Sequence, residues 1–404
     1  MKHNKFYLLC FIYLYINKIL LSMKNNNYDV IISGAGPSGA ILGYLLANKG
    51  INTLILEKES FPRYKVCAGG IQWKALKILP FNIDSIIEKK ISGIYFSRKL
   101  KDVFYKKYHD DLIYTVDRQK FDNFIVKNAI KLGCSINFKE KVLNFEIENS
   151  IVKVNTNENT YFSKILVGAD GAESIVFKKL NSNIRLQKII GYEIEEPITD
   201  FSLINDFNDN ILLDFTGVKK GYLWIFPKRE YLSIGDGGPV KDALNIKRYL
   251  VWFLKNFPDA FFKKNFNFEI KSKIKAHFIP VRGKNNFLNG YRVIVIGDAA
   301  GFGDGFTGEG LHNAFLSSNI AFESIVNALN KNDYYFIDYF NNINDKIIKN
   351  INLSLIISKI FFSSPSFYYK LIKNNDNLFN SCAKILRGEK TYSDVVNKLK
   401  LIKI

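Results

Sequence analysis

The stretch that decides the fold is YDVIISGAGPSGAILGYLLANKGINTLILE, residues 28–57. Its first part, Tyr28–Ser33, is a β-branched run of strand length. Pro37–Lys49 has the length of a helix, and Gly50 follows it as a terminating glycine does. Ile51–Leu56 predicts a second strand. The order strand, turn, helix, strand is a βαβ unit, which predicts a parallel sheet at the start of the chain.

The glycine-rich turn of this unit, residues 34–39, reads GAGPSG and matches the pattern G-x-G-x-x-G. Glycines allow the tight turn and let backbone N–H groups of the helix N-terminus approach a pyrophosphate. An acidic residue ends the second strand, where it is placed to accept a hydrogen bond from a ribose hydroxyl. A turn that binds no nucleotide is the alternative, which the flanking strand and helix disfavour. The candidate dinucleotide-binding residues are Gly34, Gly36, Ser38, Gly39 and Glu57.

Two later segments indicate which dinucleotide is bound. VGADGA at residues 167–172 and GDAAG at residues 297–301 each place a strand end, a glycine turn and an acidic residue together. They resemble the paired flavin segments of the flavoproteins that include the aromatic hydroxylases and the geranylgeranyl reductases. The resemblance implies that Asp298 binds the ribityl–pyrophosphate region of FAD, and that residues 307–311, TGEGL, complete the loop. Tightly bound FAD is the predicted cofactor, with further contacts from Gly310 and Leu311.

Three more stretches narrow the resemblance to the geranylgeranyl reductase family. FPRYKVCAGG at residues 61–70 is similar to that family's Arg-x-Lys-x-Cys-Gly-Gly stretch, and Arg118, at the start of a predicted helix, resembles its flavin-contacting Arg. GYLWIFP at residues 221–227, followed by GDG at residues 235–237, resembles its substrate-domain signature. The flavin contacts that this resemblance implies include Cys67, Ala68, Gly70, Arg118 and Val142.

The resemblance spans about residues 28–330, with three departures from the family pattern. Ala68 replaces a usual Gly, which is a conservative change. Lys219 and Gly305 stand where the family often has Pro. Because Pro restricts the unfolded chain and Gly does not, these positions predict loops that are less rigid than in the family. Their effect on activity is left open by the sequence.

The reaction that this resemblance implies is saturation of carbon–carbon double bonds in an isoprenoid (geranylgeranyl) chain, with a hydride from reduced flavin and a proton to the other carbon. Tyr222, Trp224 and Phe226 alternate along a predicted strand, so they share one face and suit a wall for a polyprenyl chain. An ordinary aromatic sheet core is the alternative. Cys67 is a candidate proton relay or gate, against the alternative of an inert buried thiol.

Other polar residues are weaker candidates. Arg63 and Lys65 suit the pyrophosphate of a prenyl diphosphate, although a solvated basic face is the favoured interpretation. The spacing of His277 and His312 does not distinguish a general acid from a structural histidine. No second G-x-G-x-x-G marks a separate domain for the electron donor, which is expected to be NADPH or another reductant.

Two other functions stay open. One is an FAD-dependent monooxygenase of the aromatic-hydroxylase type, because the Asp170-Gly171 segment is shared with that group. The other is a non-catalytic flavin electron carrier at a membrane, suggested by the positive charge, the helical tail and Gly305. The substrate headgroup, the number of bonds reduced and the oligomeric state are not encoded in any pattern of the sequence.

Composition restricts the partners. The chain has 404 residues, is 47% hydrophobic and carries a formal charge of +19. Lys greatly outnumbers Arg and no long basic run occurs, so biased composition explains the charge and no nucleic acid partner is expected. The expected partner is an isoprenoid small molecule or lipid, with peripheral membrane association left open. The scattered cysteines predict neither a disulfide framework nor a zinc site, and no metal is expected: Cys10, Cys67, Cys134 and Cys382.

The predicted fold is α/β, a Rossmann-like FAD-binding domain interrupted by an antiparallel-sheet substrate domain and followed by a helical region. Residues 1–27 hold an apolar run behind two lysines, which indicates a targeting leader, an anchor or a gene-model extension. A cytoplasmic or peripheral membrane location is favoured. The predicted divisions are 28–189 with 278–334 for the FAD-binding domain, 190–277 for the substrate domain, and 335–404 for the helical region, which Pro365 breaks.

Overall fold

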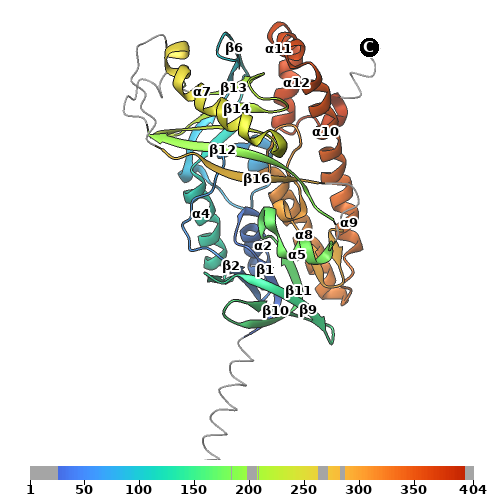
Figure 1. Ribbon diagram of the computed structural model, residues 1–404. Coiled ribbons are helices and arrows are strands. Elements are labelled where there is room, and N and C mark those ends of the chain that lie inside the picture. The colour runs from blue at the N-terminus through green and yellow to red at the C-terminus, as the bar shows by residue number, and fades with distance from the viewer. Residues whose placement is uncertain are drawn as a thin grey trace, which may run out of the picture.

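The computed structural model describes residues 26–182, 184–197, 207, 209–262, 272–282 and 287–395 (Figure 1). The predicted leader lies almost wholly outside the described residues. The described chain is a mixed α/β protein with three sheets and a helical C-terminal region. Cys67, Cys134 and Cys382 are free thiols, and Cys10 lies outside the described residues.

The flavin sheet, as we call the largest sheet, is built around the βαβ unit predicted from the sequence. Strand β1 (Asn27–Ser33) is central and pairs in parallel with β2 (Thr53–Glu57) and β11 (Thr160–Gly168). The apolar run of β1 is fully buried, as expected for a parallel strand covered on both faces. The other strands are β8 (Ser135–Phe138), β9 (Val142–Glu148), β10 (Ile151–Thr156), β17 (Asn289–Gly290) and β18 (Val293–Val295).

Helices cover the flavin sheet, and two of them begin at Pro37 and Arg118, where the sequence predicts helices. Helix α2 (Pro37–Asn48) packs against both α4 (Arg118–Lys131) and α8 (Leu311–Lys331). Asp117 caps α4 by accepting a hydrogen bond from the backbone N–H of Lys120, at 2.8 Å. Two shorter helices follow strands at the edges of the core, α3 (Trp73–Leu76) and α5 (Ile175–Leu180).

The second sheet contains the strand predicted from the alternation of Tyr222, Trp224 and Phe226, but it is larger than the predicted substrate domain. Two strands from outside the predicted range 190–277 complete one edge, and β5 pairs in parallel with β13. The sheet is therefore not wholly antiparallel. This pairing joins segments far apart in the chain, which no local pattern reveals. The strands in order are β16 (Lys275–Val281), β12 (Gln187–Pro197), β15 (Tyr231–Pro239), β14 (Tyr222–Pro227), β13 (Asn210–Phe215), β5 (Gly93–Arg98) and β6 (Asp102–Lys107).

A small third sheet joins these two parts. Strand β7 (Ile113–Val116) lies between β3 (Gly70–Gln72) and β4 (Ile87–Ile91), and both pairings are antiparallel. Because β3 directly follows the cysteine-containing stretch at residues 61–70, this sheet fixes one end of that stretch. It also leads the chain into β5 and back out from β6.

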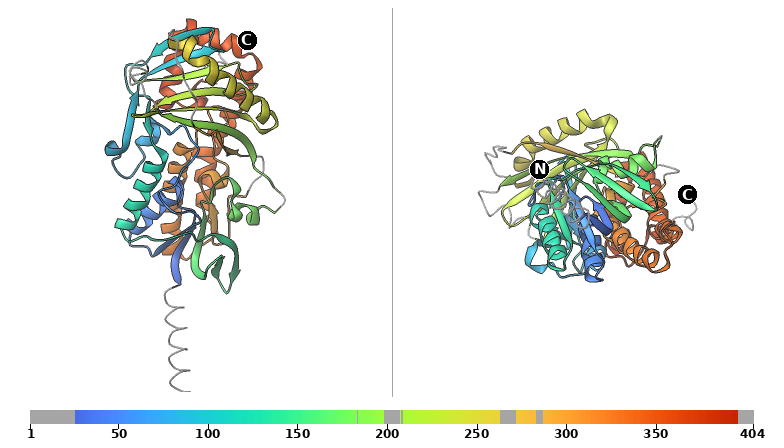
Figure 2. Two further views of the ribbon diagram at one scale, coloured as in Figure 1. Left: turned by 60° about the vertical axis from the view of Figure 1, so that its left-hand side comes forward. Right: turned by 90° about the horizontal axis from the view of Figure 1, so that it is seen from below.

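Helices cover both faces of the second sheet (Figure 2). Helix α7 (Ala243–Phe262) packs against one face, over Leu223 and Ile225. The C-terminal helices pack against the other face, as the alternation of side chains along β14 requires. They begin beside the flavin sheet and are interrupted at Pro365, as predicted: α9 (Ile337–Ile343), a π-helical turn (Asn344–Ile348), α10 (Lys349–Ser363), α11 (Pro365–Asn374) and α12 (Asp376–Leu386).

A helix that spans a membrane must be both long enough and apolar enough to cross it. No single described helix meets both requirements. One pair, Ile337–Ser363 with Pro365–Asn374, meets them together across a bend of 97°.

Candidate flavin site

One cavity of about 1680 Å³ extends from the ends of β1, β2 and β11 to the C-terminal helices, along the face of the second sheet. It brings together the sequence-predicted site residues from both halves of the chain. Gly39 is the exception, because it lies beneath the turn with its Cα facing the carbonyl of Gly34. The predicted residues that line the cavity are Gly34, Gly36, Ser38, Glu57, Cys67, Ala68, Gly70, Arg118, Val142, Tyr222, Trp224, Phe226, Asp298, Gly310 and Leu311.

The three glycines of the turn are explained by different structural features. Gly34 has φ +104°, and a Cβ there would lie 2.5 Å from the carbonyl oxygen of Ala169. A Cβ at Gly39 would lie 2.0 Å from the carbonyl oxygen of Gly34. Gly36 differs, because in the described part of the chain a Cβ there has one neighbour beyond the adjacent residues, Arg63 Nη2, at 3.8 Å. The space beside Gly36 belongs to the cavity, next to the uncapped N-terminus of α2, where a pyrophosphate fits.

Two carboxylates stand on either side of this turn. Glu57 accepts hydrogen bonds from the backbone N–H groups of Ala35, at 2.7 Å, and Glu59, at 2.9 Å, while lining the cavity. Asp298 follows β18, and a Cβ at Gly310 would come within 3.2 Å of its Oδ1. Burial raises the pKa of Asp298, and nearby cationic side chains oppose that shift. Both carboxylates lie where the sequence places cofactor contacts, and their contacts with FAD stay predictions.

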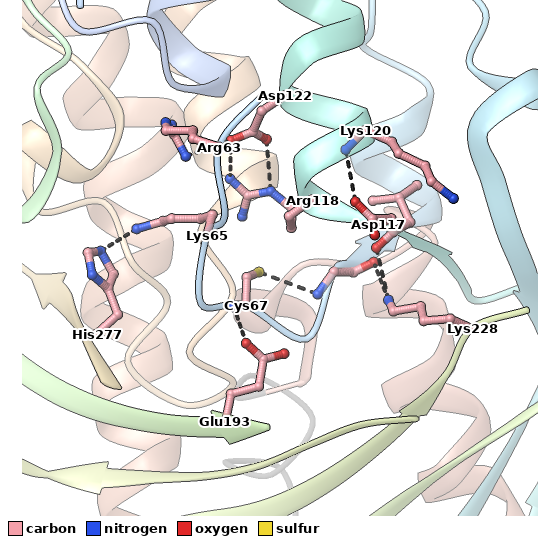
Figure 3. A network of polar contacts seen from close by, with 12 residues as sticks. Arg63, Lys65, Cys67, Asp117, Arg118, Lys120, Asp122, Glu193, Lys228 and His277 are labelled. Atoms are coloured by element: carbon pink, nitrogen blue, oxygen red, sulfur yellow. Dashed lines mark hydrogen bonds and ion pairs between the residues drawn. The ribbon is translucent and has the colours of Figure 1, made fainter. Parts of the chain in front are cut away.

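A buried ion-pair network lies beside the turn (Figure 3). Arg118 Nε and Nη2 donate to the two carboxylate oxygens of Asp122, at 2.9 and 3.0 Å, one turn along α4. Arg63 Nη1 is 3.3 Å from the same carboxylate. Lys65 contacts His277 across the cavity. Arg63 and Lys65 therefore line the cavity and have partners, so their interpretation as a solvated basic face is wrong.

Two buried charged residues that the sequence analysis missed hold the Cys67 stretch from below. Glu193, on β12, accepts a hydrogen bond from the backbone N–H of Cys67 at 2.6 Å. Lys228 is 1% exposed, and its Nζ donates to the carbonyls of Ala68, at 2.7 Å, and Val116, at 2.9 Å. Burial lowers the pKa of Lys228 to about 8. The sequence contains one indication of this role for Lys228, which is that it directly follows the GYLWIFP signature.

Comparison with known proteins decides the family. The family model described as "FAD binding domain" matches residues 27–314. The chain belongs to this FAD-binding family. It is an FAD-dependent oxidoreductase and binds FAD.

Relatives and solved structures agree with this flavoprotein assignment. An uncharacterized protein of Methanosarcina barkeri is 31% identical over 382 residues, covering 93% of this chain and 95% of that protein. The digeranylgeranylglycerophospholipid reductase of Methanosarcina acetivorans is 29% identical, covering 76% of this chain and 77% of that protein. The fold matches a geranylgeranyl bacteriochlorophyll reductase-like protein of Thermoplasma acidophilum (TM-score 0.70, 22% identity, 90% and 92% coverage). It also matches an FAD-bound halogenase (TM-score 0.66, 18% identity, 83% and 77% coverage).

The two candidate histidines of the flavoprotein both have strongly lowered basicity. Burial lowers the pKa of His277 to about 3, and the neighbouring ammonium of Lys65 adds to this effect. His277 is thus neutral at pH 7 and accepts the hydrogen bond from Lys65. Burial also lowers the pKa of His312 to about 3, and its Nδ1 is buried with no hydrogen-bond partner among the described residues. Neither ring holds an acidic imidazolium proton at neutral pH. In the described part of the chain, no group of His, Cys, Asp and Glu is arranged for a metal ion.

The burial of His312 predicts a specific loss of stability in acid. Its pKa is lowered on folding, so the unfolded chain binds the proton more tightly and stability falls as pH drops from about 6.5 toward 3. The slope for one such group is about 1.4 kcal/mol per pH unit. In urea unfolding at pH 7, 6, 5 and 4, His312→Gln is expected to lose stability less steeply than the wild type. His109→Gln, at an exposed site, is the control; parallel curves for all three proteins would contradict the prediction.

Proposed function

We propose that this protein is an FAD-dependent reductase that saturates carbon–carbon double bonds of an isoprenoid lipid chain. The observation that carries the proposal is the continuity of the cavity, which joins the FAD side to a long apolar part between β14 and the C-terminal helices. The digeranylgeranylglycerophospholipid reductases among the relatives support the substrate class. When a chain of repeated isoprene units is buried in such a space, each methylene contributes about 0.8 kcal/mol to the free energy of binding.

The wall of the apolar part comes from two directions. On one side, Tyr222, Trp224 and Phe226 project from the same face of β14, and their neighbours Leu223 and Ile225 face the other way, toward α7. The opposite side is formed by apolar residues of α10, α11 and α12, which include Ile357, Phe361, Tyr368, Leu371, Leu378 and Leu386. An ordinary aromatic sheet core would leave no such space in front of β14.

Gly235 and Gly237, on the strand next to the aromatic signature, are explained by their contact with Trp224. The indole of Trp224 lies over Gly235, where a Cβ would come within 2.2 Å of the ring. Over Gly237 the corresponding distance is 3.4 Å. The residues GDG at positions 235–237 therefore leave room for the tryptophan to lie flat against β15. This arrangement opens the space in front of the sheet.

The residues of the chain have defined tasks in the proposed reaction. Reduced FAD, when bound, supplies the hydride. Cys67 Sγ accepts from the backbone N–H of Gly69 at 3.4 Å, and Glu193 accepts from the backbone N–H of Cys67 at 2.6 Å, so the thiol is fixed at the cavity wall. In this proposal Cys67 Sγ holds the proton for the second carbon, and the apolar wall excludes water from the reacting bond. NADPH or another reductant supplies the electrons, and the lipid substrate implies peripheral contact with a membrane.

The test is anaerobic product analysis. Purified protein with chemically reduced FAD is incubated with prenyl diphosphates, prenylated glycerophospholipids and prenylquinones, and the products are measured by mass spectrometry. The expected result is a gain of two hydrogens per reduced double bond, with oxidation of the flavin. In a parallel incubation in air, substrate-dependent oxygen uptake with a hydroxylated or halogenated product would instead establish a monooxygenase or halogenase. Oxidation of the flavin by an electron acceptor with no mass change in any lipid would favour the carrier.

Trp224→Leu is expected to weaken binding of the isoprenoid and to spare the cofactor. The variant removes part of the flat wall that the chain contacts, which costs on the order of 1.5 kcal/mol. We therefore expect KM for the prenyl substrate to rise about tenfold with unchanged FAD content. Trp252→Leu is the control, because Trp252 lies on α7, outside the cavity, and stacks on Tyr249. Equal KM values for both variants would argue against a substrate wall on β14.

A further inference from the structure

The loop of residues 304–310, DGFTGEG, connects the Asp298 turn to helix α8 and lines the cavity from Gly305 onward. Gly305 is the position where the family often has Pro. Its backbone N–H donates to Ser354 Oγ on α10, at 2.9 Å, which a proline cannot do. A Cβ at Gly305 would also lie 2.4 Å from Leu355 Cδ2. Gly305, which predicted a loose loop, is thus held by a direct hydrogen bond to a C-terminal helix.

A second bond reaches the same loop from the end of the chain. The hydroxyl of Tyr392 donates to Asp304 Oδ2 at 2.9 Å, and both residues are 8% exposed. The other oxygen, Asp304 Oδ1, accepts from the backbone N–H groups of Phe306, at 2.9 Å, and Thr307, at 2.8 Å. Asp304 therefore shapes the loop, and Tyr392 fixes Asp304. Hydrogen bonds to a charged acceptor contribute more than neutral ones, particularly when buried.

The segment that carries Tyr392 is itself held in place. Arg387 Nη1 donates to the carbonyl of Asp111 at 2.7 Å, and its Nη2 is 3.2 Å from the carboxylate of Asp110. Gly388 has φ +72° and packs so closely that a Cβ there would lie 2.9 Å from Lys74 Cβ. These contacts attach residues 387–392 to the region of the third sheet before the chain reaches the loop. Tyr392 is thus presented by an anchored segment.

We infer that Ser354 and Tyr392 are positioning residues for the flavin-facing loop, so that the C-terminal helical region forms part of the FAD site. The two side chains hold adjacent residues, Gly305 and Asp304, from two directions. The loop leads directly into Gly310, which lies against Asp298, and into the N-terminus of α8 at Leu311. Displacement of the loop therefore changes the wall that the cofactor contacts. The inference rests on FAD binding and is independent of the substrate proposed above.

The experiment compares Tyr392→Phe and Ser354→Ala with the wild type by titration of the apoprotein with FAD. Loss of one such hydrogen bond is expected to raise the dissociation constant of FAD about tenfold in each variant. The visible absorption band of bound flavin and its fluorescence are expected to shift toward those of free FAD. No substrate is needed, so this result stands or fails separately from the isoprenoid reductase assay.

Tyr369→Phe is the matched control. Tyr369 is a buried tyrosine of α11 whose hydroxyl donates to the carbonyls of Phe96 and Asp102, and it is not a cavity residue. This variant is expected to lower the melting temperature and to leave FAD affinity and the flavin spectrum unchanged. Wild-type FAD affinity and spectrum in both Tyr392→Phe and Ser354→Ala would overturn the inference. So would an equal loss of FAD affinity in Tyr369→Phe, which would indicate a general effect of stability.

Discussion

Gly36→Ala is expected to give a folded protein that no longer retains FAD. Among the described residues other than its chain neighbours, the added methyl group meets no atom closer than 3.8 Å, and the backbone of Gly36, with φ −64° and ψ 176°, suits any residue. The fold therefore tolerates the change. The methyl group does, however, occupy the part of the cavity beside the α2 N-terminus that we assign to the pyrophosphate. A steric cost of about 1–3 kcal/mol weakens FAD binding by about fivefold to 150-fold.

The measurement is the ratio of flavin absorbance to protein absorbance after gel filtration, together with circular dichroism. Gly39→Ala is the contrasting variant, because its Cβ would lie 2.0 Å from a backbone carbonyl and must distort the turn itself. Gly39→Ala is expected to lose both FAD and stability, whereas Gly36→Ala loses FAD alone. A yellow Gly36→Ala protein with wild-type FAD content would show that the pyrophosphate lies elsewhere.

Arg118→Met is expected to cause the largest loss of stability among these variants. The guanidinium makes both of its bonds to Asp122, whose side chain is fully buried. Methionine retains the volume but leaves Arg63, at 3.3 Å, as the one cation that the described residues place beside that carboxylate. Removing one partner of a buried ion pair costs about 3–5 kcal/mol. Since Arg118 also lines the cavity beside Cys67, FAD retention is expected to fall together with the urea midpoint.

Lys349→Met provides a matched control for this prediction. Lys349 pairs with Asp345 at 2.7 Å with the same spacing of four residues along a helix, but both side chains are about two-thirds exposed. Exposed helical pairs contribute about 0.3–0.5 kcal/mol. The urea midpoint of Lys349→Met should therefore stay close to that of the wild type. If both variants unfolded at similar urea concentrations, the burial of the Arg118 pair would not be the source of its effect.

Local rules made the flavin half of the site readable from the sequence. Gly34 has φ +104° and a Cβ at Gly39 would meet the carbonyl oxygen of Gly34, so both requirements arise within the turn, and the strand and helix around it have regular periodicity. The aromatic face of β14 was readable for the same reason, because alternation along a strand is a local property. The cavity then brings these separately predicted segments together.

The rest of the site depends on contacts between distant segments. Glu193 supports Cys67 across 126 residues, and Lys228 reaches Ala68 across 160 residues, so neither partner predicts the other from sequence. The replacement of a proline at Gly305 suggested a loose loop because the compensating hydroxyl of Ser354 lies 49 residues away. In each case the missing information was tertiary proximity, not an unusual residue.

The parallel pairing of β5 with β13 has a consequence for biosynthesis. One edge of β5 pairs with β6, which follows it directly in the chain. At the other edge Gly93 pairs with Asn210, so that edge has no partner until the ribosome has translated beyond residue 210. At translation rates of about 5–20 residues per second, this interval lasts on the order of ten seconds. During that time the nascent chain exposes the apolar side chains of Ile94 and Phe96, which are buried in the finished protein. An unpaired apolar edge of this kind is prone to aggregate, so chaperone capacity in the host should determine how much soluble protein is obtained.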